Sequence, residues 1–244
     1  NMAAYTTIDG PSAHHQTVIY TGDGNSNHAI TYDGNSDLQP DFIWNKVRTL
    51  ADSHALFDST RGVNKILYSN ITLGEGTDTN GNIESFDTDG ITVGGNQEYA
   101  NKDGAGQVSW GWKANGGSTS SNTSGDITST VQVNSTAGFS IGTYTGDGDN
   151  TSSVGHGLGA IPALVILKSR TGSHSWIVWH QNLTATTAYA LDLENTDAQA
   201  NNASYFYDTA PDANTFHPGD GGASNGSGTA TLFYAWKDVQ GFSK

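Results

Sequence analysis

Apolar residues lie in short runs separated by polar stretches rich in glycine, asparagine, aspartate, serine and threonine. The runs contain mainly valine, isoleucine, threonine and aromatic residues, which are enriched in β-strands, whereas the polar stretches have the composition of turns. No window keeps an apolar period of 3.6 residues over three turns, so no long helix is expected. The predicted strands cover residues 17–20, 42–47, 55–57, 66–68, 91–93 and 108–113, and then residues 139–144, 163–168, 176–179, 189–193 and 231–236. Many short strands joined by polar turns are typical of an all-β sandwich or jelly roll.

The strands also indicate where the core lies. The stretch from Leu164 to Leu167 is apolar at every position, so this strand is expected to be covered on both faces. The strands at 108–113 and 231–236 carry large side chains at alternate positions, which places them on one face of each strand. We expect these two strands to close the core.

The chain contains an internal repeat. The sequence YTGDG occupies residues 20–24 and returns 124 positions later at residues 144–148. Two further pairs of segments match at offsets of 124 and 122 positions, namely residues 110–114 with 234–238 and residues 42–49 with 164–171. A small shift inside a fixed frame is what loop insertions and deletions produce. The predicted fold is therefore all-β, with two tandem antiparallel β-sandwich (jelly-roll-like) domains related by internal duplication.

The repeat sets the expected domain boundaries. Residues 1–115 are predicted to form the first sandwich and residues 131–244 the second, each long enough to bury its own core. Residues 116–130, rich in glycine, serine and threonine, are expected to be a linker. The last four residues, 241–244, resemble the opening of the second repeat at 138–141, so this end either closes the final sheet or pairs with a neighbouring subunit.

The charge balance argues against two classes of partner. The chain has 24 acidic and 10 basic side chains, for a formal net charge of −14. Binding to nucleic acid needs a basic surface, and anionic membranes attract basic segments, so neither partner is expected. An acidic surface keeps a protein soluble by self-repulsion. It would also suit a salty medium, where that repulsion is screened, so a salty or marine medium and an ordinary one both remain open. No apolar run approaches the length of a membrane span, so membrane insertion is not expected.

The chain lacks the residues that several kinds of catalysis require. The chain has no cysteine, which excludes disulfides, thiolate metal sites and cysteine nucleophiles and suits assembly in a reducing cytoplasm. The serine pattern Gly-x-Ser-x-Gly does not occur. The glycine-rich stretch at residues 155–159 leads into a predicted strand, whereas a phosphate-binding loop leads into a helix. We therefore expect neither enzymatic activity nor a catalytic cofactor.

One loop has the composition of a calcium site. Its oxygen-bearing side chains are those of Asp78, Asn80, Asn82, Glu84, Asp87 and Asp89. Calcium binds several oxygen ligands at once, and this spacing lets one loop supply many of them. The full EF-hand pattern is absent, however, and Asp-x-Asp-Gly is also an ordinary tight-turn sequence. Calcium binding and turn formation both remain open for this loop.

Aromatic side chains provide a second candidate site. Trp179, Tyr205 and Tyr207 lie among asparagine and aspartate residues, as in many sugar-binding sites. Trp176 and Trp179 are three positions apart, so on a strand one side chain faces inward and the other outward. Trp179 or the tyrosine loop is therefore expected to be exposed. The alternative is that these aromatics belong to the core or are scattered over the surface.

A longer pattern resembles a known family. GFSIGTYTGDG at residues 138–148 is followed by GHGLG at 155–159 and by a hydrophobic strand that ends in Lys-x-Arg within 162–170. Further matches are LFDSTRG at 56–62, SFDTDG at 85–90 and GFSK at 241–244. The pattern is similar to a β-repeat of virion structural and tail-associated proteins of tailed bacteriophages, notably marine phages. The first repeat departs from it, since residues 29–38 replace the GHGLG loop.

The resemblance implies a structural role and transfers no catalytic residues. It implies a location on the exterior surface or tail of a virion, as a tail-fibre, tail-associated or capsid-decorating component. The implied partners are other virion proteins, further copies in an oligomer or lattice, and a host-surface glycan. Residues 78–89, 205–208 and 220–227 would be the loops presented for adhesion or assembly. Two alternatives remain open: a lectin-like carbohydrate-binding module that uses exposed aromatics, and a tail-associated polysaccharide depolymerase.

Overall fold

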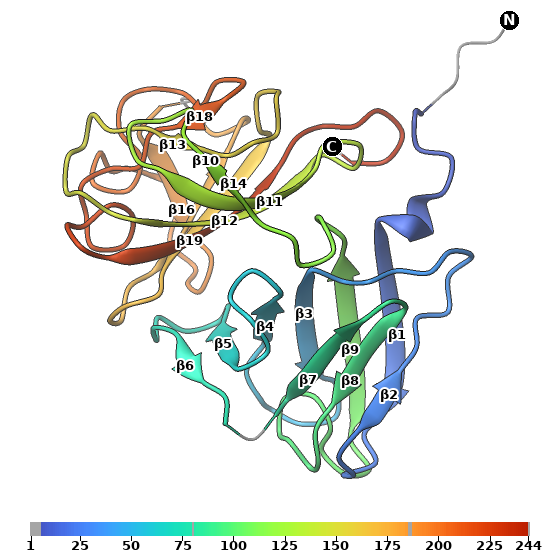
Figure 1. Ribbon diagram of the computed structural model, residues 1–244. Coiled ribbons are helices and arrows are strands. Elements are labelled where there is room, and N and C mark those ends of the chain that lie inside the picture. Colours follow the sequence, from blue (N-terminus) through green and yellow to red (C-terminus); the bar gives the residue numbers. More distant parts are fainter. Residues whose placement is uncertain (1–5, 80, 185–186, 244) are drawn as a thin grey trace, which may run out of the picture. The chain divides into compact units, whose positions relative to one another are not determined.

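The computed structural model describes residues 6–79, 81–184 and 187–243 and consists mainly of β-strands and loops (Figure 1). All pairings between its named strands are antiparallel. One short 3-10 helix, η1 (Pro11–Ala13), precedes the first strand. The predicted all-β antiparallel class is thus confirmed. Nowhere in the described part of the chain is a helix long and apolar enough to cross a bilayer.

The chain divides into two compact units. The first unit comprises residues 10–71 and 75–117. The second comprises residues 118–244 together with residues 1–9 and 72–74, as far as these are described. Each unit contains its own sheets and its own cluster of buried apolar side chains.

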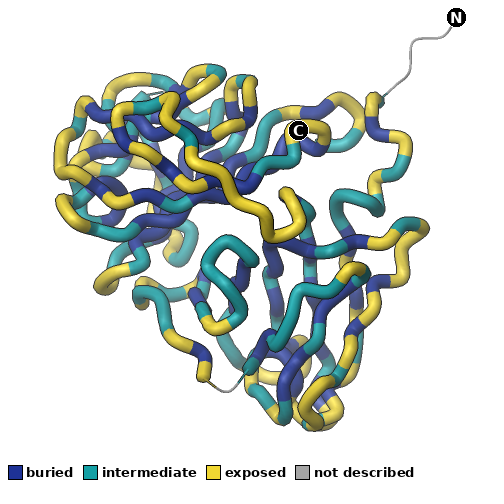
Figure 2. Tube along the Cα trace, viewed as in Figure 1, coloured by how far each residue is buried: buried dark blue, intermediate teal, exposed yellow. Residues whose placement is uncertain are grey.

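The first unit has two layers of strands. They are β1 (His15–Thr21), β2 (His28–Ile30), β3 (Phe42–Val47), β4 (Ala55–Asp58), β5 (Lys65–Tyr68), β6 (Gly76–Thr77), β7 (Ile83–Asp87), β8 (Gly90–Val93) and β9 (Gly106–Trp112). One sheet has the order β1-β9-β3-β4-β5-β6, and the other has the order β2-β8-β7. Ile43 and Phe57 of the larger sheet and Ile91 and Val93 of the smaller one belong to one buried cluster, so the two sheets share a core (Figure 2).

The second unit is built in a similar way. Its strands are β10 (Ser120–Asn122), β11 (Ser129–Asn134), β12 (Phe139–Thr145), β13 (Val154–Gly155), β14 (Leu164–Ser169), β15 (Trp176–His180), β16 (Tyr189–Asp192), β17 (Ala200–Asn201), β18 (Thr215–Phe216) and β19 (Ala230–Trp236). Eight form a sheet in the order β10-β11-β12-β19-β14-β15-β16-β17, and β13 pairs with β18. The buried cluster joins Val165, Ile177 and Phe233 of the large sheet to Val154 and Phe216 of the small one.

Central strands follow the apolar pattern of the sequence. Within β14, Val165, Ile166 and Leu167 are all buried, as expected for a strand covered on both faces. β1 instead alternates, with Gln16 and Val18 buried between more exposed neighbours. Strand position in the sheet therefore matches the apolar pattern in both cases.

The segment expected to be a linker contains strands. β10 and the start of β11 fall within residues 116–130, and β11 pairs along β12. Serine and threonine occupy many of these positions, so no apolar run marks them. Such residues suit strands near a sheet edge, where one side faces water, and their place is set by pairing with the next strand along the chain.

The two YTGDG segments form turns with the same hydrogen bonds. The main-chain N–H of Asp23 donates to Asn101 Oδ1 (3.0 Å), and Asn101 Nδ2 donates back to Asp23 Oδ1 (3.2 Å). Asp147 and Asn225 make the same reciprocal pair at 3.1 and 2.8 Å. Each aspartate also accepts from the N–H two residues later, at 2.8 and 2.9 Å. Both aspartates are therefore turn-forming residues.

The end of the chain pairs locally. Val239 N–H donates to Ser243 O at 3.0 Å, and Ser243 N–H donates to Val239 O at 2.9 Å. The GFSK segment thus folds back within the chain as far as Ser243, and Lys244 lies outside the described residues.

Candidate functional site

The first part of the predicted calcium loop uses its oxygens within the protein. Asp78 Oδ2 accepts the main-chain N–H of Asn82 at 2.6 Å, and Asn82 Oδ1 accepts that of Tyr99 at 3.2 Å. Glu84 Oε2 accepts the main-chain N–H of Asn27 at 3.1 Å. Asp78 and Asn82 are buried, and Asn80 lies outside the described residues. These side chains tie the loop to neighbouring segments.

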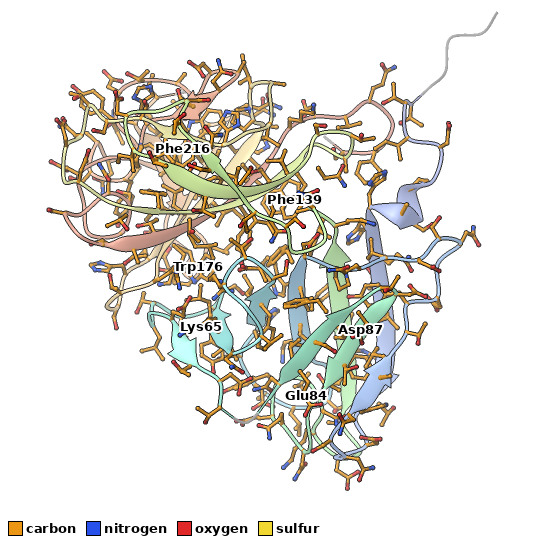
Figure 3. All side chains as sticks on the ribbon, in the orientation of Figure 1. Lys65, Glu84, Asp87, Phe139, Trp176 and Phe216 are labelled. Carbon is orange, nitrogen blue, oxygen red and sulfur yellow. The ribbon has the colours of Figure 1, made fainter. Side chains whose placement is uncertain are left out.

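The remaining residues of this loop lie on or beside β7. Figure 3 shows Glu84 near the start of β7 and Asp87 at its end. Asp87 accepts hydrogen bonds from Ser85 Oγ (2.6 Å) and Thr92 Oγ1 (2.7 Å), and Asp89 Oδ1 accepts the N–H of Leu38 (3.1 Å). Among the described residues, no three histidine, aspartate or glutamate side chains gather closely enough to hold a metal ion. The described oxygens of this loop are thus spread over a loop and a strand, and other groups of the protein hold them.

Trp179 is not the exposed aromatic that the sequence suggested. It is 2% exposed and belongs to the core cluster of the second unit, and Trp176 is also buried. The spacing argument assumed that one face of the strand meets solvent. β15 instead lies between β14 and β16, and four of its five residues are buried.

Tyr205 and Tyr207 flank a core residue. Phe206 between them is 1% exposed, while both tyrosines are partly buried. Tyr205 packs in part against the core, and the Tyr207 N–H donates to His217 O at 3.0 Å. With Trp179 buried, the three predicted residues do not form one aromatic platform.

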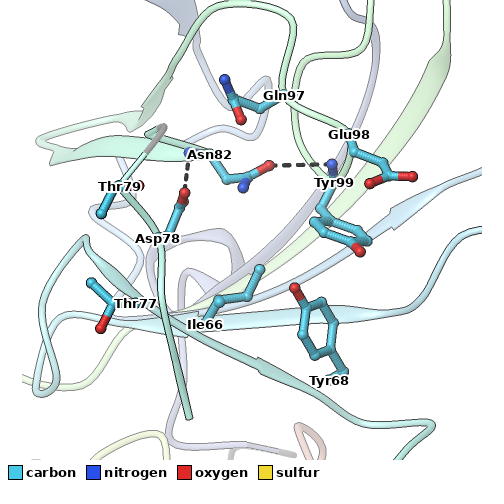
Figure 4. A pocket seen from close by; sticks show the side chains of 9 residues that line it. All are labelled: Ile66, Tyr68, Thr77, Asp78, Thr79, Asn82, Gln97, Glu98 and Tyr99. Atoms are coloured by element: carbon cyan, nitrogen blue, oxygen red, sulfur yellow. Dashed lines mark hydrogen bonds between the residues drawn. The ribbon is translucent and has the colours of Figure 1, made fainter. Parts of the chain in front are cut away.

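A recess in the first unit brings together residues that the sequence patterns had separated (Figure 4). It is lined by Ile66, Tyr68, Thr77, Asp78, Thr79, Asn82, Gln97, Glu98 and Tyr99. These come from β5, from the segment around β6, and from the loop after β8. The recess has a volume of about 230 Å³. That is slightly below the range of about 300–1,000 Å³ for pockets of drug-sized ligands, so it suits one small molecule.

Asn82 fixes the wall of this recess. It links Asp78 on one side to Tyr99 on the other through the two hydrogen bonds given above (Figure 4). The rings of Tyr68 and Tyr99 meet edge to face, with centroids 5.0 Å apart and planes at 61°. Aromatic rings in this arrangement pack favourably, which holds both hydroxyl-bearing side chains in place.

Two groups of the recess, Tyr68 and Glu98, have a pKa raised above the ordinary value. Burial raises the pKa of Tyr68, and the hydrogen bond with Tyr99 and the nearby Asp78 and Glu98 carboxylates raise it further. The pKa of Glu98 is raised, mainly by a hydrogen bond with the Asp52 carboxyl, then by loss of hydration and the charge of Asp52.

The recess is suited to polar recognition. Hydroxyl, amide and carboxyl groups surround two aromatic rings, a combination that binds uncharged polar molecules such as sugars. The nine lining residues include no histidine, serine or lysine, so the recess itself holds no nucleophile paired with a histidine or lysine base. Sequence analysis found only its Asp78 and Asn82, because Tyr68, Gln97, Glu98 and Tyr99 reach the recess through tertiary packing.

The comparisons with known proteins give a family without a described activity. No curated protein and no solved structure matches the chain significantly. One family model, described as a domain of unknown function (DUF7483), matches residues 10–244, a range that takes in strands of both units. The chain therefore belongs to the DUF7483 family.

Proposed function

We propose that this protein is a non-enzymatic structural component on the exterior of a tailed-bacteriophage virion, in a tail fibre, beside the tail or on the capsid. It is built from two jelly-roll-like β-sandwiches that arose by internal duplication. It presents loops for assembly with other virion proteins or with further copies, or for adhesion to a host-surface glycan.

The observation that carries the proposal is a set of hydrogen bonds repeated at a constant offset. Tyr20 Oη donates to Ala100 O at 2.7 Å, and Tyr144 Oη donates to Ser224 O at 2.7 Å. The donor and the acceptor in the second unit each stand 124 positions after those in the first unit. The same offset separates the aspartates and the asparagines of the two YTGDG turns. Such agreement in side-chain contacts is expected from duplication, since unrelated sandwiches share only their general architecture.

The sheets support the same interpretation. The order β1-β9-β3-β4-β5-β6 corresponds to β12-β19-β14-β15-β16-β17. The registers correspond as well: His15 opposite Trp112 and Phe42 opposite Asp58 in one sheet, Phe139 opposite Trp236 and Leu164 opposite His180 in the other. The shifts are 124 for β1 and β9 and 122 for β3 and β4, the two offsets found in the sequence.

A duplicated scaffold fits an assembling protein. Two copies of one framework provide two sets of loops, which favours repeated contacts with neighbours. The acidic surface limits non-specific association, and the resemblance of residues 138–170 to a phage β-repeat supplies the virion context.

Cryo-electron microscopy of purified phage particles that encode this chain tests the proposal. Density for the chain at regular positions on the capsid, along the tail or in a fibre is the expected result. Particles that lack the chain, with the protein recovered only in the soluble fraction of lysed cells, would contradict a virion role.

The recess between Tyr68 and Tyr99 favours a second candidate, a carbohydrate-binding function. Its aromatic rings and polar groups take the place of the platform predicted around Trp179, whose side chain lies in the core. Calorimetric titration with soluble host glycans should show binding that Tyr68→Phe and Glu98→Gln weaken and that Tyr205→Ala leaves unchanged. Binding that is lost only with Tyr205→Ala would place the sugar elsewhere.

A further inference from the structure

β1 forms one edge of the six-stranded sheet (Figure 1). Its only strand partner in the described residues is β9. His14 and Gly22 lie just before and just after β1, and their main-chain hydrogen bonds join residues at the two ends of β9. Because main-chain groups alternate in direction along a strand, the main-chain groups of the even-numbered residues of β1 face β9. The main-chain groups of Thr17, Ile19 and Thr21 therefore point away from the sheet. All three residues are exposed.

The corresponding edge of the second unit is covered. β12 lies beside β19 as β1 lies beside β9, and β11 pairs along its other side. There Thr130 lies opposite Thr143, which stands 124 positions after Ile19. In the second unit, the edge equivalent to that of β1 is therefore paired with an antiparallel strand, β11.

β1 lacks the features that usually protect a strand edge. Natural edges are blunted by lysine, proline, bulges or very short strands. β1 is seven residues long, contains no proline, lysine or carboxylate, and keeps an unbroken register with β9. Ile19 is 63% exposed, the highest value among the exposed large hydrophobic side chains of the described residues. This edge is a template for pairing with another strand.

We propose that β1 pairs with β1 of a second copy of this chain, antiparallel, about a two-fold axis at Ile19. Only the odd-numbered residues offer free N–H and C=O groups, so a symmetric ladder pairs odd with odd. Centred on Ile19, the ladder sets the two Ile19 side chains against each other and pairs Thr17 with Thr21 of the second copy. It satisfies the free main-chain groups and covers exposed apolar surface.

Charge predicts how this association responds to salt. A formal net charge of −14 opposes the approach of two copies. β1 itself carries no carboxylate, so salt removes the general repulsion without weakening an attractive ion pair within the strand. The dimer should therefore strengthen as NaCl is raised. The inference rests on the geometry of the edge and not on the proposed function.

Sedimentation velocity of the full chain, over a concentration series at low and high NaCl, tests the proposal. The wild type is expected to show a monomer–dimer equilibrium that favours dimer in high salt. Ile19→Lys places two ammonium groups at the axis and should raise the dimer dissociation constant by about tenfold or more. Ile161→Lys is the matched control, because Ile161 is 60% exposed and lies outside the strands; it should leave the constant unchanged.

Two further variants separate pairing from folding. Thr17→Pro removes an N–H that faces away from β9, so it removes a bond of the proposed dimer and none of the β1–β9 ladder. Circular dichroism should show an intact fold while the dimer is lost. Ile19→Cys introduces a cysteine into a chain that has none, and oxidation should link two copies. Directly opposed residues lie about 5.5 Å apart at Cα, within disulfide range.

Three results would overturn the proposal. These are a wild type that stays monomeric at its highest soluble concentration in high salt, a dimer that survives both Ile19→Lys and Thr17→Pro, and cross-linking of Ile161→Cys as fast as that of Ile19→Cys. Each is measured on the isolated chain, so none decides whether the protein occurs in a virion.

Discussion

At the residue scale, buried polar side chains distinguish the two units. Asn45 and Gln107 correspond, at the offsets of 122 and 124, to Leu167 and Thr231. Asn45 Oδ1 and Gln107 Nε2 are buried and have no hydrogen-bond partner in the described residues, whereas Thr231 Oγ1 donates to Ser224 O at 2.9 Å. The first unit therefore keeps incompletely satisfied amides where the second has an apolar side chain and a satisfied hydroxyl.

We predict that substitutions of Asn45 and Gln107 change the free energy of unfolding non-additively. Asn45→Leu combined with Gln107→Thr should raise the free energy of unfolding by about 1 kcal/mol, because the unpaired Asn45 Oδ1 and Gln107 Nε2 atoms leave the core. Asn45→Leu alone should lower it, since Gln107 Oε1 then loses the amide that donates to it at 3.2 Å. Urea denaturation of the wild type, the two single variants and the double variant measures both effects. A double variant less stable than each single one would contradict the prediction.

The burial of His156 predicts how the stability of the fold depends on pH. It is fully buried, and burial lowers its pKa from 6.5. Its Nδ1 accepts the N–H of Leu158 at 3.1 Å, so this nitrogen carries no proton. The unfolded chain takes up a proton near pH 6.5 and the folded chain only at lower pH. The contribution of the neutral His156 side chain to stability is therefore present above pH 6.5 and is lost as the pH falls below that value.

Urea denaturation between about pH 8 and 5 checks this prediction. The wild type should lose stability below about pH 6.5. His156→Gln should be less stable at high pH and should lose less stability across the same range. His180→Gln is the control, because His180 is only partly buried. Equal slopes for the wild type and His156→Gln would exclude His156 as the source.

At the scale of elements, β10 and β11 decide where the second unit begins. β11 pairs along β12 from Thr130 to Asn134, and its Val131 belongs to the core cluster. The sequence predicted that this unit starts at residue 131, inside β11. The structure places residues 118–130 in the same compact unit, since β12 would otherwise become an open edge.

Two fragments test this boundary. Residues 118–244 should unfold in one cooperative transition, because they contain all strands of the eight-stranded sheet. Residues 134–244 lack β10 and nearly all of β11 and should melt at a lower temperature or bind the dye ANS, which reports exposed apolar surface. Near-ultraviolet circular dichroism during heating distinguishes them. Identical melts for both fragments would show that β11 is dispensable.

At the scale of the whole molecule, self-repulsion should limit stability. The formal net charge of −14 disfavours the compact state, and added salt screens that repulsion. In the Ile19→Lys variant, used to suppress dimers, moderate NaCl should raise the melting temperature by about 2–4 °C, equivalent to about 1 kcal/mol for a chain of this size. Scanning calorimetry measures the shift, and sucrose is the control that does not screen charge. No rise with NaCl would mean that repulsion is minor.

The sequence by itself determined the class of the fold and most of its strands. Alternating and continuous apolar runs are local patterns, and each of the eleven predicted ranges overlaps a strand, with residues 42–47 matching β3 at both ends. The short strand β2 and the strands β7, β10 and β11 were not predicted, although β11 has valine at the alternate positions 131 and 133. Pairing with a neighbouring strand places these segments in a sheet, and the apolar pattern of one segment does not register that pairing.

Only the tertiary structure decided which side chains of the candidate sites are exposed and which of them lie together. Whether an aromatic side chain is exposed depends on what covers both faces of its strand, and Trp179 is buried although its spacing predicted exposure. Whether oxygens form a metal cage depends on where the backbone directs them, and Asp87 and Glu84 are held by separate donors along β7. The recess of Tyr68 and Tyr99 joins segments about thirty residues apart. Burial and convergence of side chains are properties of packing, so the chain order determines them only through the folded structure.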